Sequence, residues 1–152
     1  MMRNKNNYIE EYFVIKKYPS TLNIKIDKAV FLAQIKKDNI NYLLGSNGKL
    51  VRSYDKENKV PMIFGEVNYK YFFDFKNIIE ESDFDYNKIK NLFFYKSGRW
   101  DIETDNGILI RLPKENLKKS LNFALEIMNK NQFKKIIKID LRQKNQVIIN
   151  EN

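Results

Sequence analysis

The acidic side chains whose spacing comes nearest to a catalytic or metal-binding group lie between residues 80 and 85. Glu80, Glu81, Asp83 and Asp85 form the single carboxylate cluster of the sequence. A calcium loop needs oxygen ligands at alternating positions, a central glycine and a terminal glutamate, and this stretch supplies neither the glycine nor the terminal glutamate. We therefore interpret the cluster as a solvated helix end followed by a turn.

Phosphate binding and nucleophilic catalysis find little support in the sequence. Gly45-Ser46-Asn47-Gly48-Lys49 has the composition of a phosphate-binding loop, but it lacks that motif's glycine spacing and opens no helical pattern, so it predicts a hairpin turn. Cysteine and histidine are both absent, which removes the thiol nucleophile, the commonest general base and the commonest metal ligand. We predict no catalytic residue, metal, cofactor or small-molecule ligand. A carboxylate-dependent enzyme is an alternative that would need a pocket of convergent acids with perturbed pKa values.

The strong positive charge makes nucleic-acid binding a second alternative. The net charge is +9 at pH 7, from 23 lysines and five arginines spread along the whole chain, whereas nucleic-acid binding uses a clustered basic stripe. Lys, Asn and Ile supply 62 of the 152 residues, and because AT-rich codons encode all three, genome composition explains the basicity equally well. A basic RNA-binding module would show binding that falls steeply with salt.

A hairpin followed by a helix is the clearest structural pattern in the chain. Two segments of alternating polarity, 100–104 and 108–112, flank Asn106-Gly107. This pattern predicts a β-hairpin with a type I′ turn, in which both central residues have positive φ. Pro113 suits the first turn of a helix. One apolar stripe at helical spacing then follows: Leu117, Leu121, Ala124, Leu125 and Met128.

The other patterns extend this sheet and add a second helix. A helix is expected between residues 71 and 81, where Phe72, Phe75, Ile78 and Ile79 have helical spacing. Strands are expected at 12–18, 22–26, 30–35, 42–44, 50–51, 89–95, 133–141 and 147–149, with turns at 19–20, 37–39 and 46–48, a polar loop at 54–59 and a packed edge or loop at 60–65. Leu22, Ile24 and Ile26 alternate with polar residues, as in a half-buried strand. The predicted fold class is α+β, a mostly antiparallel β-sheet with two amphipathic helices packed on it.

Aromatic residues are numerous enough to suggest base stacking as well as packing. The chain has eleven Phe, nine Tyr and one Trp, and aromatic rings stack on unpaired bases in RNA-binding proteins. Most of them have core-compatible spacing, including Phe72, Phe75, Phe93 and Phe123, so packing is the expected role. Trp100, which opens the hairpin, is predicted to be a core anchor.

The last apolar segment is the candidate binding site. Val147, Ile148 and Ile149 form a short predicted strand near the end of the chain. A strand at a sheet edge presents unpaired N–H and C=O groups that another chain can use. The alternative is that this strand pairs internally on one side and leaves its other side to water.

Several motifs in a fixed order resemble those of one known family. Residues 18–26 (YPSTLNIKI) resemble a P-x-T-L-x-V-x-V hairpin. Leu43-Leu44 with Gly48, and then residues 60–65 (VPMIFG), resemble L-h-D-x-x-G and L-P-h-L-x-G elements. Residues 98–102 (GRWDI) with 105–107 (DNG) resemble an R-x-W-x-L-x-L-x-N-G hairpin, and residues 139–142 (IDLR) resemble a V-D-L-R strand. Together, over residues 7–150, they resemble the bacterial division protein family FtsQ, called DivIB in other lineages.

The resemblance implies a domain organisation. The family has a cytoplasmic tail, one membrane helix, a POTRA domain and a C-terminal β-domain, the last two outside the cytoplasmic membrane. Residues 1–28 would be the C-terminal remnant of a truncated POTRA domain, ending in its final hairpin, and residues 29–152 the β-domain. The tail, the membrane helix and most of the POTRA domain would be missing from this sequence, for which the choice of start site is one explanation. The apolar face of the hairpin would therefore lack its usual cover. No apolar run in the sequence reaches the ~18 residues of a membrane helix.

The resemblance also implies a function, a location and partners. It points to a non-catalytic divisome scaffold at the periplasmic side of the cell inner membrane, single-pass in the full-length family, which binds FtsB and through it FtsL. The partner would add a strand beside the last strand, Arg142 would pair with a partner carboxylate, and Arg99 would be a second contact. The implied partner-binding residues are Arg142, Gln143, Asn145, Val147, Ile148, Ile149 and Arg99. Gln143 replaces the family's usual aromatic residue, a change that main-chain recognition tolerates.

Overall fold

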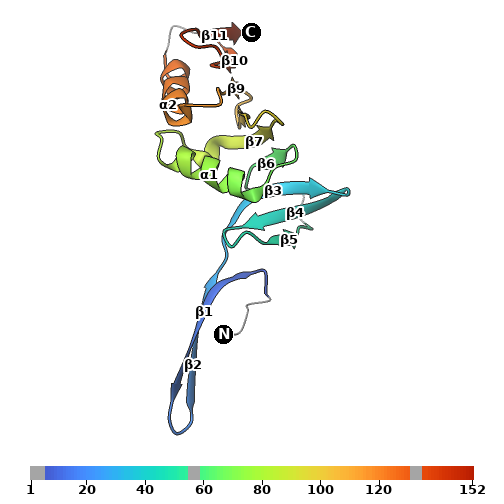
Figure 1. Cartoon of the computed structure of the whole chain (residues 1–152), viewed down its shortest axis with the longest axis vertical. Helices are drawn as coiled ribbons and strands as arrows, with labels where there is room; N and C mark the ends of the chain where they lie inside the picture. The colour runs from blue at the N-terminus through green and yellow to red at the C-terminus, as the bar shows by residue number, and fades with distance from the viewer. Residues whose placement is uncertain (1–5, 55–58, 131–134) are drawn as a thin grey trace. The chain divides into compact units, whose positions relative to one another are not determined.

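The chain is an α+β protein, and its described residues form two α-helices and strands with mostly antiparallel pairing. The computed structural model describes residues 6–54, 59–130 and 135–152 (Figure 1). The chain divides into two compact units, Met1–Asn58 and Lys59–Asn152. In the part of the chain that the structure describes, neither helix is long and apolar enough to cross a membrane.

The first unit begins with a two-stranded hairpin. Strand β1 (Ile9–Lys17) pairs in antiparallel fashion with β2 (Thr21–Lys28), so both predicted strands are confirmed, with β1 starting earlier than expected. The half-buried pattern expected from the alternation in β2 is wrong, because Leu22, Ile24 and Ile26 are 55%, 56% and 51% exposed. The same exposure confirms the expectation that the apolar face of this hairpin lacks cover. The alternation of these residues marks a face that no described element covers.

A three-stranded antiparallel meander completes the first unit. It contains β3 (Phe31–Lys37), β4 (Ile40–Gly45) and β5 (Leu50–Arg52). Asp38 and Asn39 join the first two strands with φ values of 50° and 61°, the backbone of a type I′ turn. Gly48 N–H donates to the Gly45 carbonyl at 2.9 Å, which confirms a hairpin turn at residues 45–49. Most of the polar loop predicted at 54–59 lies outside the described residues.

The described part of the second unit contains six strands and two α-helices. Its elements are β6 (Met62–Phe64), α1 (Tyr69–Glu80), the 3-10 helix η1 (Tyr86–Lys88), β7 (Ile89–Phe94), β8 (Trp100–Thr104), β9 (Leu109–Arg111), α2 (Leu117–Met128), β10 (Ile136–Asp140) and β11 (Ile148–Glu151). The strands lie in the order β6-β7-β8-β9-β10-β11, with the β6/β7 and β9/β10 pairs parallel. The segment at residues 60–65 was expected to be a packed sheet edge or a loop. It contains strand β6, which pairs with β7.

One face of this sheet forms the core with the two helices. The registers place Ile63, Leu92, Ile102, Ile110, Ile139 and Ile149 in one row across the six strands, and all but the last, which is half-buried, are buried. Trp100 lies on the same face, 3% exposed, and stacks on Phe75 of α1 with ring centroids 4.8 Å apart. The prediction that Trp100 anchors the core is therefore confirmed.

The start of α2 and one of its aromatic residues differ from the predictions. Pro113 lies four positions before the first residue of α2, and Asn116, with φ of 57°, precedes the helix instead. Leu121, Ala124 and Ile127 are the buried residues of the helix. Phe123 is 40% exposed, so the prediction that it packs in the core is wrong. It directly precedes the buried Ala124, and successive side chains of an α-helix point about 100° apart, so Phe123 lies at the flank of the buried face.

The turn between β8 and β9 also differs from the predicted type I′ turn. Only Gly107 of the Asn106-Gly107 pair has positive φ, 84°. Gly107 N–H donates to the Thr104 carbonyl at 3.0 Å, and Thr104 N–H donates to the Ile108 carbonyl at 3.0 Å. These bonds define a three-residue loop in which a tight turn is followed by a left-handed glycine. The loop sets the register of β8 and β9, in which Asp101 lies opposite Arg111.

Candidate binding surface at the C-terminal edge

Strand β11 is the last strand of the second unit's sheet. It pairs with β10 in antiparallel register, with Ile149 opposite Ile139 and Ile148 opposite Asp140, and its other side pairs with no described strand. Ile148 is 40% exposed and Ile149 is half-buried. Val147 precedes the strand, which extends to Glu151 instead of ending at Ile149 as predicted. Main-chain groups along β11 are therefore placed where an edge strand recruits another strand.

The connection from β10 to β11 forms one wall of an open groove. Gln143, Asn145 and Val147 line this groove of about 320 Å³. Its other wall is α2, which contributes Lys119, Ser120 and the exposed ring of Phe123. Asn145 takes a left-handed φ of 63° in the turn. Three of the residues implied by the resemblance thus line one groove beside the edge strand.

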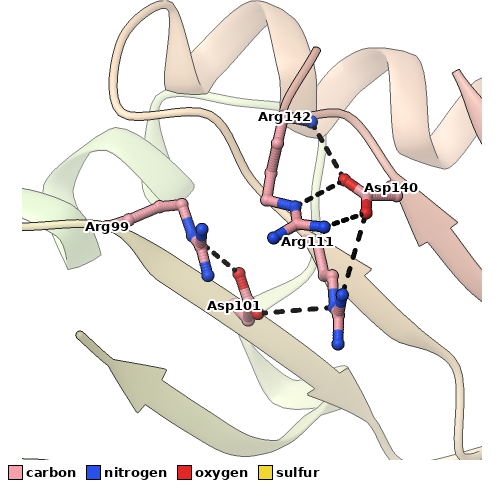
Figure 2. A network of polar contacts seen from close by, with 5 residues as sticks. All are labelled: Arg99, Asp101, Arg111, Asp140 and Arg142. Atoms are coloured by element: carbon pink, nitrogen blue, oxygen red, sulfur yellow. Dashed lines mark hydrogen bonds and ion pairs between the residues drawn. The ribbon is translucent and has the colours of Figure 1, made fainter. Parts of the chain in front are cut away.

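A row with three charged residues at its centre crosses the sheet face that the helices do not cover. The registers place Phe93, Asp101, Arg111, Asp140 and Ile148 side by side on strands β7 to β11. Arg99 precedes β8 and Arg142 follows β10, and both reach into this row (Figure 2). The structure therefore brings together Arg99 and Arg142, which are far apart in the sequence, as the two ends of one network.

Arg142 and Asp140 form the tightest contact of the network. Arg142 Nε donates to Asp140 Oδ1 at 2.8 Å, and Nη2 donates to Oδ2 at 2.6 Å. Such a two-pronged pair is among the strong hydrogen-bonded contacts of proteins. The Arg142 guanidinium accordingly holds the pKa of the Asp140 carboxyl below its usual range. The Arg142 side chain is still 38% exposed, so one side of the guanidinium can meet another molecule.

Asp101 occupies the centre of the network and is almost completely buried. Its side chain is 1% exposed and lies between Arg99 Nε, 3.4 Å from Oδ1, and Arg111 Nε, 3.9 Å from Oδ2. Among the described residues, neither carboxylate oxygen nor either Nε atom has a hydrogen-bond partner of good geometry. Burial raises the pKa of Asp101 above its usual value, against the opposing effect of Arg99. Arg99 also lies over the Tyr95 ring, 4.5 Å from its centroid.

Three members of this network were missed by sequence reasoning as site residues. Asp101, Arg111 and Asp140 link the two predicted arginines, and Arg111 Nη1 lies 3.9 Å from Asp140 Oδ2. The sequence does contain Asp101 and Arg111 at polar positions of two adjacent predicted strands. Their proximity can be recognised only when the register of these strands is known. In the described part of the chain, no group of three or more acidic residues is placed to hold a metal ion. Among the described residues, the carboxyl groups with shifted pKa values are those of Asp101 and Asp140, and each of them pairs with arginines instead of with another acid.

The comparisons with known proteins identify the class to which this chain belongs. The family model described as "Cell division protein FtsQ/DivIB, C-terminal" matches residues 33–142, which is more than half of the chain. The chain is therefore a member of the FtsQ/DivIB family of cell division proteins.

The chain is also similar to individual proteins. The chain is 26% identical over 147 residues to the cell division protein FtsQ of Rickettsia bellii (strain RML369-C), a match that covers 95% of this chain and 55% of the relative. The chain thus spans about half the length of that curated relative. Among solved structures, it matches the major extracytoplasmic domain of the trans isomer of DivIB from Geobacillus stearothermophilus, with a TM-score of 0.49, 11% identity, and coverage of 71% of this chain and 99% of that chain.

Proposed function

We propose that this chain is a non-catalytic scaffold of the division machinery that binds FtsB, and through it FtsL, by accepting a strand at β11. The single observation that supports this proposal most is the position of β11 at the end of the sheet, paired on one side with β10. An added strand would gain main-chain hydrogen bonds along the other side, and these depend little on side-chain identity. The proposed location is the periplasmic side of the cell inner membrane.

The side chains around β11 would supply the specificity. Arg142 keeps an exposed side while Asp140 holds its Nε and Nη2, so the Arg142 guanidinium is fixed in direction before a partner carboxylate arrives. Such preorganisation reduces the side-chain entropy lost on binding. The groove lined by Gln143, Asn145 and Val147 would receive side chains that the added strand points toward α2.

Proline substitutions in β11 test strand addition. Successive N–H groups of a strand point to opposite sides, so of Ile148→Pro and Ile149→Pro one removes a donor to β10 and the other removes a donor from the outer edge. We expect the variant that keeps the wild-type circular dichroism spectrum to bind the extracytoplasmic segment of the organism's FtsB at least tenfold more weakly, measured by calorimetry. Lys130→Ala, beyond the end of α2, is the control and should bind as wild type does. A folded proline variant of the outer-edge position that binds like wild type would show that the edge is not used.

A further inference from the structure

The three arginines on the sheet face that the helices leave uncovered differ in the number and length of their polar contacts. Arg142 makes two hydrogen bonds to Asp140, and Arg99 lies over the Tyr95 ring beside Asp101. Arg111 has only ion-pair contacts at 3.9 Å, to Asp101 and to Asp140, which is longer than a hydrogen bond. Its Nε atom, like that of Arg99, is buried without a hydrogen-bond partner in the described part of the chain. Arg111 differs from Arg99 in that both of its ion-pair contacts are as long as 3.9 Å, against 3.4 Å for Arg99, and in that its side chain is more exposed, at 34% against 22%.

The charges around Arg111 do not balance. Three guanidinium groups share two carboxylates, Asp101 and Asp140, in this network (Figure 2). Asp140 is committed to Arg142, and Asp101 lies between Arg99 and Arg111. The Arg111 side chain is 34% exposed, so its outward side is open to another molecule. A further carboxylate would supply both the missing charge and the missing acceptors, with the paired geometry that a guanidinium favours.

We propose that Arg111 is the central receptor for an acidic side chain of the bound partner, with Asp101 and Asp140 holding its guanidinium from either side. This inference rests on the proposed function, because it assigns the chemistry of the same partner. Arg111 lies on β9, two strands from β11, which corresponds to about 10 Å at ordinary strand spacing. The carboxylate must therefore come from a part of the partner that crosses the sheet face, outside the strand that adds to β11.

A comparison of Arg111→Gln with Arg111→Lys tests this role. We expect Arg111→Gln to weaken binding of the FtsB extracytoplasmic segment at least tenfold, and Arg111→Lys to restore only part of it, because lysine keeps the charge and loses the planar fork. Lys138→Gln is the matched control, because Lys138 lies two register positions from Asp140, opposite Leu109, and it should change the affinity less than twofold. Equal losses of affinity from Arg111→Gln and Lys138→Gln would mean that the partner responds to the overall positive charge and not to Arg111 in particular.

A double-mutant cycle separates recognition from a merely structural role. Each acidic residue of the FtsB segment is changed to its amide in turn. The substitution that removes the partner of Arg111 should weaken binding to the wild-type chain at least fivefold and have no further effect on Arg111→Gln. If no amide substitution shows this coupling in a folded Arg111→Gln variant, the inference is wrong while strand addition stands. If the wild-type chain does not bind the segment at all, both proposals are wrong.

Discussion

Asp101 and Asp140 are identical in type and lie on one sheet face, yet their environments act on them in opposite directions. Asp140 accepts two hydrogen bonds from the Arg142 side chain, and these lower its pKa. Asp101 is more deeply buried and has arginines on both sides at longer distances, so desolvation dominates and its pKa rises. The balance between desolvation and hydrogen bonding, rather than the number of nearby arginines, decides the direction of each pKa shift.

The two aspartates should therefore contribute to stability with opposite pH dependence. The depressed pKa of Asp140 gives stability that is present above the unfolded-state value near 3.8 and is lost as the pH falls through the folded-state value. The raised pKa of Asp101 means that stability falls as the pH rises from 3.8 through the folded-state value.

Amide substitutions measured by urea unfolding can check this difference. At pH 7 we expect Asp140→Asn to lower the free energy of unfolding by about 1 kcal/mol, a value kept small because Arg142 is partly exposed to solvent. We expect Asp101→Asn to lower it less, or to raise it, with the difference between the two variants shrinking toward pH 3. Asp105→Asn, at an exposed turn position, serves as the control. A larger loss for Asp101→Asn at pH 7 would contradict the assigned directions.

The turn between β8 and β9 shows why the elements could be predicted and the site could not. The alternating patterns predict the strands, but a two-residue type I′ turn at Asn106-Gly107 would place Asp101 opposite Leu112. The observed loop is one residue longer and places Asp101 opposite Arg111. A one-residue slip changes every cross-strand neighbour. The side-chain hydrogen bond from Ile108 N–H to Thr104 Oγ1, at 3.0 Å, supports the observed loop and has no clear signature in the sequence.

The β1–β2 hairpin is expected to be the least stable paired element. Its apolar residues on β2 are about half exposed, and a two-stranded ribbon without cover is marginally stable in water. The β8–β9 hairpin instead packs Ile102 and Ile110 under the helices, both completely buried. We expect backbone amides in β1–β2 to exchange hydrogen for deuterium at least a hundredfold faster than those in β8–β9. Equal protection of the two hairpins would contradict the prediction that residues 1–28 are an incompletely covered remnant.

At the scale of the whole chain, composition proved a poor guide and the order of motifs a good one. The net charge of +9 suggested a nucleic-acid partner, whereas the family match covers residues 33–142 and places the chain among division proteins. The residues of the R-x-W-x-L-x-L-x-N-G and V-D-L-R motifs lie at β8 with its following turn and at the end of β10, and they include Arg99, Asp101, Asp140 and Arg142 of the network. The boundary between a POTRA remnant and the β-domain after residue 28 stays a prediction. The division into compact units after residue 58 reflects contacts within the structure and does not test that family boundary.

The salt dependence of binding distinguishes the two partner classes for the whole molecule. Binding that neutralises six to ten phosphates loses about 10³–10⁵ in affinity between 50 and 200 mM salt, because condensed counterions are released. Strand addition with one or two charge contacts depends mainly on hydrogen bonds and apolar contacts, so we expect the FtsB segment to lose less than tenfold over the same range. Fluorescence anisotropy with the labelled segment and with a labelled single-stranded RNA of similar length measures both. Tight RNA binding at 50 mM salt that falls steeply by 200 mM, together with no binding of the segment, would favour the basic RNA-binding module instead.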